Sequence, residues 1–299
     1  MSDMPRVSFF LMTYKQEAFV AKALKSLFDQ DYPNLQIVVS DDCSPDGTRR
    51  VIEEVVAGYD GPHDLVVSFN EKNLLFTHLT KIMDLTDGAF IVQGHGDDVF
   101  HPDRAARMVE VWQRTGADVV TTNAVVIDAE DNPLRYWRDP NTRHDCSLEA
   151  FVRDLSIPAG FGAGMGWSRA LWERWGGLPR GPRQMDLVWA FRGCLMGGCE
   201  FISDPLINYR DHGDNMSMWA LRKKAKDETA LMLVNERHIG NVAANIVAFI
   251  DMIQAHLKDH PEDARARAAL TPLIQHLLGT TSQWTRLRGE MAAQHVGVV

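Results

Sequence analysis

The sequence predicts an α/β protein with a mostly parallel, Rossmann-like sheet followed by a C-terminal helical extension. Short apolar runs alternate four times with amphipathic helical stripes, which is typical of parallel strands connected by helices. From Met218 onward the composition changes to long helical patterns without further strand signals. We therefore expect one domain over residues 1–217, in two halves (1–128 and 129–217), and a helical extension over residues 218–299.

The first half of the domain contains four short apolar runs bounded by turn residues, as expected for buried strands. These runs are Val7–Met12, Leu35–Val39, Leu65–Phe69 and Ala89–Val92. Apolar residues at helical spacing follow each run. The stripes predict helices from Phe19 to Phe28, from near Asp46 to Val56, from Leu75 to Leu85 and from about Pro102 to Trp112.

The second half is less regular. A Val- and Thr-rich strand is expected at Asp118–Asp128, and residues 129–155 look irregular. Pro158–Trp167 contains four glycines, which could pass beneath a bound sugar or simply form a tight strand turn. The remaining expected elements are helices at Arg169–Trp175 and Met185–Met196, a strand at Phe201–Asn208, and a long apolar stripe from Ile239 to Leu257. Such a stripe predicts core packing or a homodimer contact.

Composition excludes several classes of protein. A formal net charge of -9 argues against sequence-independent binding to nucleic acid. No window reaches the roughly 18 consecutive apolar residues of a membrane span. No signal peptide is evident, so we expect a cytoplasmic protein, with peripheral attachment at the inner face of the membrane as the other option. The cysteines, which lack the close spacing of zinc ligands, are expected to be reduced thiols. They are Cys43, Cys146, Cys194 and Cys199.

Three polar clusters directly follow predicted strands. They are Thr13–Lys15, Asp41–Asp42 and Asp97–Asp98. Because ligands bind beyond the carboxyl ends of parallel strands, these clusters should meet at one edge of the sheet and form a site. The adjacent Asp97 and Asp98 offer hard oxygen ligands for Mg²⁺ or Mn²⁺ bound to a diphosphate. The alternative is a strand-to-helix turn whose carboxylates bond their own backbone.

Two further candidates lie later in the chain. Asp186 begins a predicted helix, where a carboxylate also suits the helix dipole. The run Tyr209–Ser217 (YRDHGDNMS) is dense in groups that bind metal or phosphate, which favours a site for His212 and Arg210. For the other histidines, including His95, and for the tryptophans, core or surface packing is the expected role.

These motifs together resemble a family 2 glycosyltransferase with the GT-A fold. The resemblance rests on a first strand ending in TYK, SDDCSPDGT after the second, GDD after the fourth, and YRDHGDNMS near the end. It covers roughly residues 5–217, and nothing in residues 218–299 contributes. It implies an inverting transfer from a nucleoside-diphosphate sugar, with a UDP-sugar favoured, to a saccharide or lipid-linked acceptor, as in the synthesis of cell-surface polysaccharide or glycolipid.

The resemblance also implies roles for individual residues. Thr13, Tyr14, Asp41, Asp42 and Asp97 would bind the nucleotide, with Asp41 accepting a hydrogen bond from the base. A divalent cation, Mn²⁺ or Mg²⁺, would be held by Asp97, Asp98 and His212, and Arg210 would help to neutralise the diphosphate. Asp186 occupies the position of the catalytic base. One Asp that takes the acceptor proton and a cation that stabilises the leaving diphosphate are what an inverting displacement requires.

Two departures from the family pattern keep alternatives open. His95 replaces an acid that commonly stands two residues before the metal-binding Asp, and Met185 replaces the Glu that usually precedes the base. A non-catalytic nucleotide- or glycan-binding protein on the same fold therefore remains an alternative. A sugar-phosphate nucleotidyltransferase is the other, although it would be expected to carry a Gly-rich basic loop where this chain has TYKQE.

Overall fold

The computed structural model describes residues 4–156, 161–179, 184–212 and 226–296. The first half of the domain contains β1 (Val7–Thr13), α1 (Val20–Phe28), β2 (Leu35–Asp41), α2 (Thr48–Ala57), β3 (Asp64–Phe69), η1 (Leu75–Thr77), α3 (His78–Met83), β4 (Phe90–His95), β5 (Val99–Phe100), α4 (Arg104–Thr115) and β6 (Val119–Ile127). The remainder contains β7 (Pro133–Tyr136), α5 (Leu148–Asp154), η2 (Gly162–Gly164), β8 (Met165–Ser168), α6 (Arg169–Trp175), α7 (Met185–Leu195), β9 (Cys199–Arg210), α9 (Glu228–Asp259) and α10 (Ala264–Val296).

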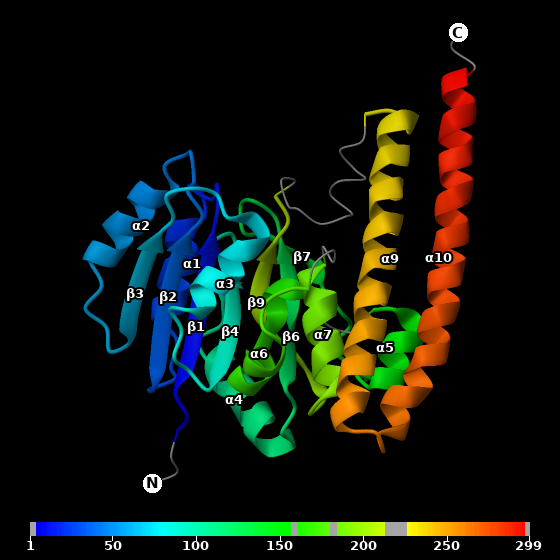
Figure 1. The fold of residues 1–299 in the computed structure, drawn as a ribbon. Coiled ribbons are helices and arrows are strands. Elements are labelled where there is room, and N and C mark those ends of the chain that lie inside the picture. Colours follow the sequence, from blue (N-terminus) through cyan, green and yellow to red (C-terminus); the bar gives the residue numbers. More distant parts are fainter. Residues whose placement is uncertain (1–3, 157–160, 180–183, 213–225, 297–299) are drawn as a thin grey trace.

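The strands form one curled sheet in the order β3-β2-β1-β4-β8-β6-β9-β5, with β7 paired to β6 (Figure 1). The long pairings are parallel: β1 lies between β2 and β4, β2 pairs with β3, and β6 pairs with β9. The short pairings of β8, β5 and β7 are antiparallel. The predicted mostly parallel α/β fold is therefore confirmed.

The four predicted N-terminal strands and their helices are present, as are the predicted elements at β6, α6, α7 and β9. The expectation that residues 129–155 are irregular was wrong, because β7 and α5 lie there. The sequence also gave no prediction of β5. A two-residue strand such as β5 contains no period that could reveal it, and it exists only because β9 pairs with it.

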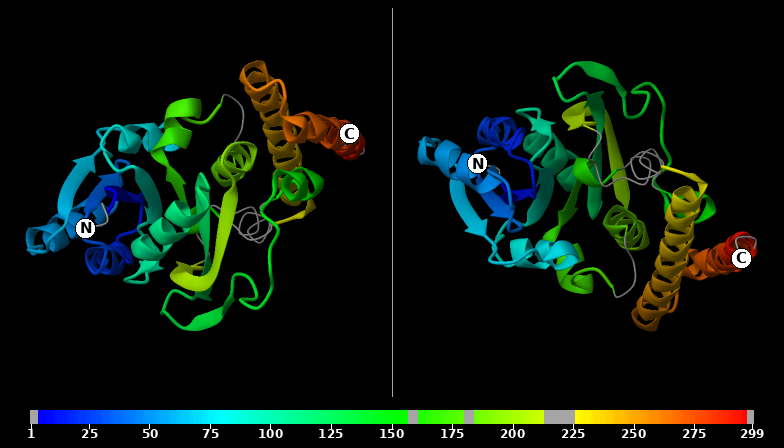
Figure 2. Two further views of the ribbon diagram at one scale, coloured as in Figure 1. Left: turned by 90° about the horizontal axis from the view of Figure 1, so that it is seen from below. Right: turned by 90° about the horizontal axis from the view of Figure 1, so that it is seen from above.

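Helices cover both faces of the sheet, as the views along its edges show (Figure 2). The alternation of side chains along β1 explains how. Val7, Phe9 and Leu11 pack with residues of α1, α2 and α4, whereas Phe10 belongs to the cluster that contains α3, α6 and α7. A strand whose residues are apolar on both sides is the kind that a parallel sheet between two helical layers requires.

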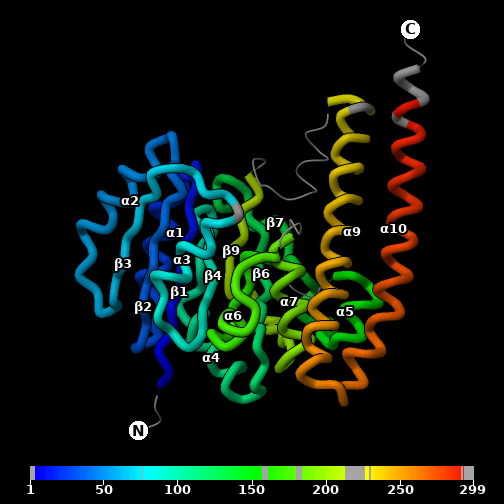
Figure 3. Tube along the Cα trace, in the orientation of Figure 1, coloured from blue at the N-terminus to red at the C-terminus, as the bar shows by residue number. Residues whose placement is uncertain are grey.

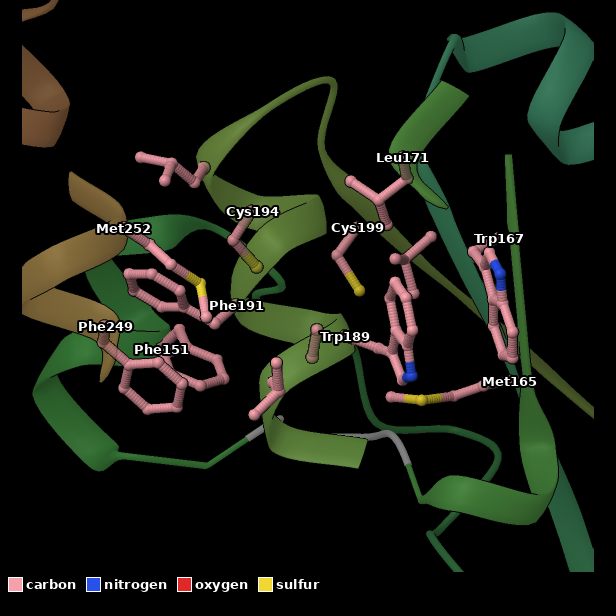
Figure 4. Close-up of a cluster of buried hydrophobic side chains, with 14 of the residues drawn as sticks. Phe151, Met165, Trp167, Leu171, Trp189, Phe191, Cys194, Cys199, Phe249 and Met252 are labelled. Carbon is pink, nitrogen blue, oxygen red and sulfur yellow. The ribbon is translucent and has the colours of Figure 1, made fainter. Parts of the chain in front are cut away.

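The second of these clusters contains a stack of indole rings (Figure 4). Trp167 and Trp189 lie parallel with centroids 4.9 Å apart, and Trp172 stacks on Trp189 at 5.6 Å. Trp167 and Trp189 are completely buried. The predicted core role of these two tryptophans is thus confirmed, and it fixes α7 against β8.

The C-terminal extension is an antiparallel pair of long helices, α9 and α10, standing beside the domain (Figures 1 and 3). One end of the pair joins the domain core, where Phe249 stacks on Phe191 of α7 at 4.3 Å and contacts Phe151 of α5. The other end extends past the domain and carries exposed apolar residues such as Leu233. The expected boundary at 217/218 lies outside the described residues. No helix within the described ranges has the length and apolarity needed to cross a bilayer.

Candidate functional site

The carboxyl ends of β1, β2 and β4 lie side by side, because Thr13 is in register with Asp41 and Met12 with His95. The Asp41 carboxylate accepts hydrogen bonds from the Thr13 hydroxyl at 2.9 Å, and from the Ser44 hydroxyl at 2.5 Å and backbone N–H at 2.9 Å. Tyr14, at the end of β1, is 39% exposed. Thr13 and Asp41 therefore form a buried hydrogen-bonded floor, and Tyr14 projects beside it.

Asp42 organises the loop that follows β3. Its Oδ1 accepts from Asn70 Nδ2 at 3.0 Å and from the Leu74 N–H at 2.8 Å, and its Oδ2 accepts from the Leu75 N–H at 3.0 Å. Asp42 is only 4% exposed. Its contribution to nucleotide binding would therefore come through the shape of this loop.

His95, Asp97 and Asp98 each place a ligand atom within 4.8 Å of the others. Asp98 is buried, and its Oδ2 has no hydrogen-bond partner among the described residues. His212 approaches the same group, with Nε2 3.1 Å from Asp97 Oδ2. A nitrogen and two carboxylates that converge around a buried oxygen lacking a partner fit a divalent cation. The sequence interpretation missed His95, since a lone His is usually a packing residue.

The pKa values of the three residues of this cluster shift in different directions. Burial and the adjacent Asp97 charge hold the pKa of Asp98 well above its ordinary value. Burial also tends to raise the pKa of Asp97, but the hydrogen bond to His212 and the nearby His95 outweigh it and lower that pKa. Burial lowers the pKa of His95. Near neutral pH, His95 is therefore uncharged with a lone pair that can bind a cation, and Asp97 is ionised.

Arg210 supports the cluster from behind. Its backbone N–H donates to Asp98 Oδ1 at 3.0 Å, and its guanidinium donates to the Asp97 carbonyl at 2.8 Å. Further bonds reach Asp131 and the carbonyls of Asp128 and Ala129, and the side chain is only 2% exposed. Arg210 therefore fixes the GDD turn, and the predicted neutralisation of a diphosphate by its positive charge stays a prediction.

A second buried cation, Arg104, was not predicted. It is fully buried in the first turn of α4, where its Cζ lies 5.1 and 5.3 Å from the ring centroids of Phe9 and Phe100, which contact each other. Its Nη2 donates to the Ala163 carbonyl at 2.8 Å, and it interacts with the charge of Asp98. Burial lowers the pKa of Arg104 to about 9. Arg104 thus links the GDD turn to the segment before β8.

Asp186 lies in the first turn of α7, where its Oδ1 accepts from the Leu187 N–H at 3.0 Å. Burial raises the pKa of Asp186, which makes the carboxylate a stronger base. Gly162 shows what lies opposite: a Cβ added there would be 3.6 Å from the Asp186 Cβ and 3.9 Å from Gln93 Nε2. Gln93 Nε2 is in turn 3.1 Å from His95 Nε2. Gly162 and Gln93 therefore connect the surroundings of Asp186 to the candidate cation cluster.

The glycines of the site have different roles. The Gly-rich segment, expected to run beneath a sugar or form a tight turn, forms η2 and β8 over its described part, and residues 157–160 lie outside the described ranges. In the GDD turn, a Cβ on Gly96 would come within 2.5 Å of Gln16 Oε1 and 2.7 Å of Thr13 Cγ2. Gly96 therefore allows the loops after β1 and β4 to approach each other.

The geometry brings together Thr13, Asp41, Asp97, Asp98, His212 and Asp186 as the sequence predicted, and adds His95, Gln93 and Arg104. A signal for His95 was available, because it stands where related chains place a metal-binding acid. No signal marked Arg104 or Gln93, since a cation at a helix start and an amide within an apolar run are ordinary locally.

Comparison with known proteins agrees with this architecture. A mannosyltransferase, PcManGT from Pyrobaculum calidifontis in complex with GDP-Man and Mn²⁺, superposes with a TM-score of 0.57 at 19% identity, covering 99% of this chain and 81% of that one. S. aureus TarS (residues 1–349) in complex with UDP-GlcNAc gives 0.56 at 17% identity, covering 94% and 92%. At these identities the similarity establishes the fold, which is GT-A.

Sequence relatives match a shorter part. EpsE of Bacillus subtilis (strain 168) is 29% identical over 129 residues, which are 43% of this chain and 46% of EpsE. The chain thus spans less than half the length of this relative. The family model for "Glycosyl transferase family 2" matches residues 8–175, more than half of the 299-residue chain. The chain belongs to glycosyl transferase family 2.

Proposed function

We propose that this protein transfers a sugar from a nucleoside-diphosphate sugar to an acceptor hydroxyl with inversion at the anomeric carbon. The observation that carries the proposal is the position of Asp186, a half-buried carboxylate of raised pKa, which is connected to the His95–Asp97–Asp98 cluster through the neighbouring Gly162 and Gln93. A base on one side and a diphosphate-binding group on the other are the two parts that a single displacement needs.

The nucleotide would lie over the loops after β1 and β2. Tyr14 is exposed there, and the hydrogen bonds among Thr13, Asp41 and Ser44 give this surface a fixed shape. Asp42 would keep the loop after β3 in place. A structural neighbour binds a GDP-sugar and another a UDP-sugar, so the uracil preference inferred from the sequence stays a prediction.

A divalent cation, Mn²⁺ or Mg²⁺, would be held by Asp97 and Asp98 with His95, and His212 would orient Asp97 or join the ligands. Such an ion, when bound, neutralises the diphosphate that departs. Arg210 holds the GDD turn in shape through its hydrogen bonds to Asp97 and Asp98, and Arg104 supplies a buried positive charge that interacts with Asp98, so that these ligands are positioned before any nucleotide binds.

Asp186 would take the proton of the acceptor hydroxyl as its oxygen attacks the anomeric carbon and the bond to the diphosphate breaks. A raised pKa suits this step, because a carboxylate of higher pKa is a stronger base and accepts the proton more readily. The acceptor is proposed to be a saccharide or lipid-linked precursor of a cell-surface polysaccharide or glycolipid, on the basis of relatives such as the succinoglycan biosynthesis protein ExoO of Rhizobium meliloti, 25% identical over 150 residues. The cytoplasmic location remains a prediction for cell fractionation.

The first experiment is a thermal-shift panel of UDP, GDP, CDP, ADP and dTDP, each with and without Mn²⁺. A ligand present at a hundred times its Kd stabilises the folded state by about 2.7 kcal/mol. We expect one diphosphate to raise the melting temperature only with the metal, and Asp97→Asn to abolish that shift. A chain that binds none of the five with or without metal would refute the proposed donor site.

Transfer itself is tested with Asp186→Asn, which preserves size but removes the base. Asp251→Asn, on the exposed side of α9, is the matched control. Loss of transfer with unchanged diphosphate binding in Asp186→Asn alone supports catalysis. Equal transfer rates in both variants would remove Asp186 as the base, and binding without transfer in the wild-type protein would favour the non-catalytic alternative.

A further inference from the structure

A cluster of three cysteine thiols lies at the end of α7 that is remote from Asp186. Cys194 is in the last turn of α7, Cys199 begins β9, and Cys146 lies in the loop before α5. Cys194 Sγ donates to the Cys146 carbonyl oxygen at 3.1 Å, and the Cys199 thiol lies beside the thiols of both other residues. Figure 4 shows Cys194 and Cys199 near each other at this end of the helix.

All three cysteines line one cavity of about 1070 Å³ between the loop before α5, the start of β9 and the start of α10. Cys194 and Cys199 are 4% and 7% exposed, whereas Cys146 is half-buried. A small polar solute that enters the cavity therefore reaches the Cys146 sulfur most easily. The polar side chains of His144, Glu200 and Arg265 also line the cavity, so it can admit such a solute.

The electrostatics distinguish the thiols. The interaction with Cys199 lowers the pKa of Cys146, and the same interaction, with Cys194 and burial, holds the pKa of Cys199 well above its ordinary value. A thiolate is the reactive form of cysteine, so Cys146, the more accessible of this pair, is also the more readily ionised. Its neighbour Cys199 is the less readily ionised of the two.

We propose that Cys146 is a peroxide-reactive modification site and that Cys199 resolves the oxidised product into an intrachain disulfide. The Cys146 thiolate attacks one oxygen of hydrogen peroxide, the O–O bond breaks, and sulfenic acid and hydroxide form. The Cys199 sulfur then attacks the Cys146 sulfur, the S–S bond forms, and the S–O bond breaks. The thiol proton of Cys199 leaves with the hydroxyl as water. In total, the oxidation of two cysteines to one disulfide supplies the two electrons that reduce one peroxide.

The disulfide would tie the loop before α5 to the first residue of β9 and close one wall of the cavity. The side chains of Cys146 and Cys199 interact with each other and line the same cavity, which brings the two sulfur atoms to one place. This inference concerns a place distant from the cation cluster and does not depend on the proposed glycosyl transfer.

The test uses the full chain with Cys43→Ser, since Cys43 is exposed and would form intermolecular disulfides. The protein is treated with a few equivalents of hydrogen peroxide, blocked with iodoacetamide and digested for mass spectrometry. We expect a Cys146–Cys199 cross-linked peptide that dithiothreitol reverses. Alkylation of Cys146 before oxidation should be about tenfold faster than that of Cys194, because Cys194 is buried whereas Cys146 is half-buried and reagent access limits the rate.

Two further variants separate the steps. In Cys199→Ala the sulfenic acid should persist at Cys146 and be trapped by dimedone, whereas in Cys146→Ala no cross-link to Cys199 should form at the same peroxide dose. Should either variant unfold, Cys199→Ser or Cys146→Ser replaces it. A wild-type protein whose Cys146 is oxidised no faster than Cys194, or a Cys194–Cys199 disulfide as the main product, would overturn the proposal.

Discussion

Replacing Arg104 by Met tests the link between the two sides of the site. Arg104 is completely buried and Asp98 is 1% exposed, so the substitution leaves the Asp98 charge without its buried counter-charge. Removing one partner of such a pair typically costs about 3–5 kcal/mol. Met is an unbranched apolar side chain that can keep contact with the rings of Phe9 and Phe100, which limits the loss of packing. We expect Arg104→Met to lower the free energy of unfolding by about 3 kcal/mol at pH 8.

The loss should depend on pH in a direction that the structure defines. The folded-state pKa of Asp98 is already raised, and Arg104 works to lower it, so its removal raises that pKa further. A folded pKa above the unfolded value means that the protonated carboxyl is favoured by folding, and stability falls as pH rises toward the folded pKa. Arg104→Met should therefore cost less at pH 5.5 than at pH 8.

The assay is urea unfolding of four proteins at both pH values: wild type, Arg104→Met, Asp98→Asn and the double variant. Because the two residues interact, the double variant should recover much of the stability lost in Arg104→Met. Arg104→Lys, which keeps the charge, should lose less than Arg104→Met. An equal cost of Asp98→Asn in both backgrounds, with no pH dependence, would refute the reasoning.

Three other outcomes follow from the same structure. Gly162→Ala should leave transfer nearly unchanged, because its Cβ has ordinary contact distances, whereas Gly162→Val should reduce kcat at least tenfold by pushing on Asp186; equal kcat values would contradict this. His78 is 1% exposed, and burial lowers its pKa in the folded state. Its stabilising contribution is therefore present above the unfolded-state pKa of about 6.5 and is lost as the pH falls through the lower folded-state pKa. In urea unfolding, His78→Gln should flatten the loss of stability between pH 7.5 and 5, and an unchanged slope would be evidence against this reasoning. Asn245→Ala removes the 2.7 Å hydrogen bond from Asn245 on α9 to Gln184 at the start of α7, and it should lower kcat several-fold while it lowers the free energy of unfolding by only about 1 kcal/mol. If kcat and the free energy of unfolding instead fall in proportion in both Asn245→Asp and Asn245→Ala, global unfolding explains the loss of activity.

The sequence by itself determined the parts of this protein that depend on local patterns. Fully apolar runs flanked by turn residues located β1 to β4, and helical stripes located α1, α4 and α7, because burial on one or both sides imposes these periods directly. The same strands placed Thr13, Asp41 and Asp97 at one edge of the sheet, since parallel strands carry their carboxyl ends to the same side.

Only the tertiary structure decided what depends on distant partners. Strand β8 lies between β4 and β6 in the reverse direction, and no local period reveals a four-residue strand whose pairing is antiparallel to its neighbour β4. The engagement of Arg210 with the GDD turn, the burial of Arg104 beneath Asp98, and the meeting of three thiols from separate elements likewise arise from long-range packing. Side-chain periodicity reports which face of an element is buried, but not which residue of another element packs against that face. The chemistry of this site depends on those contacts between distant residues.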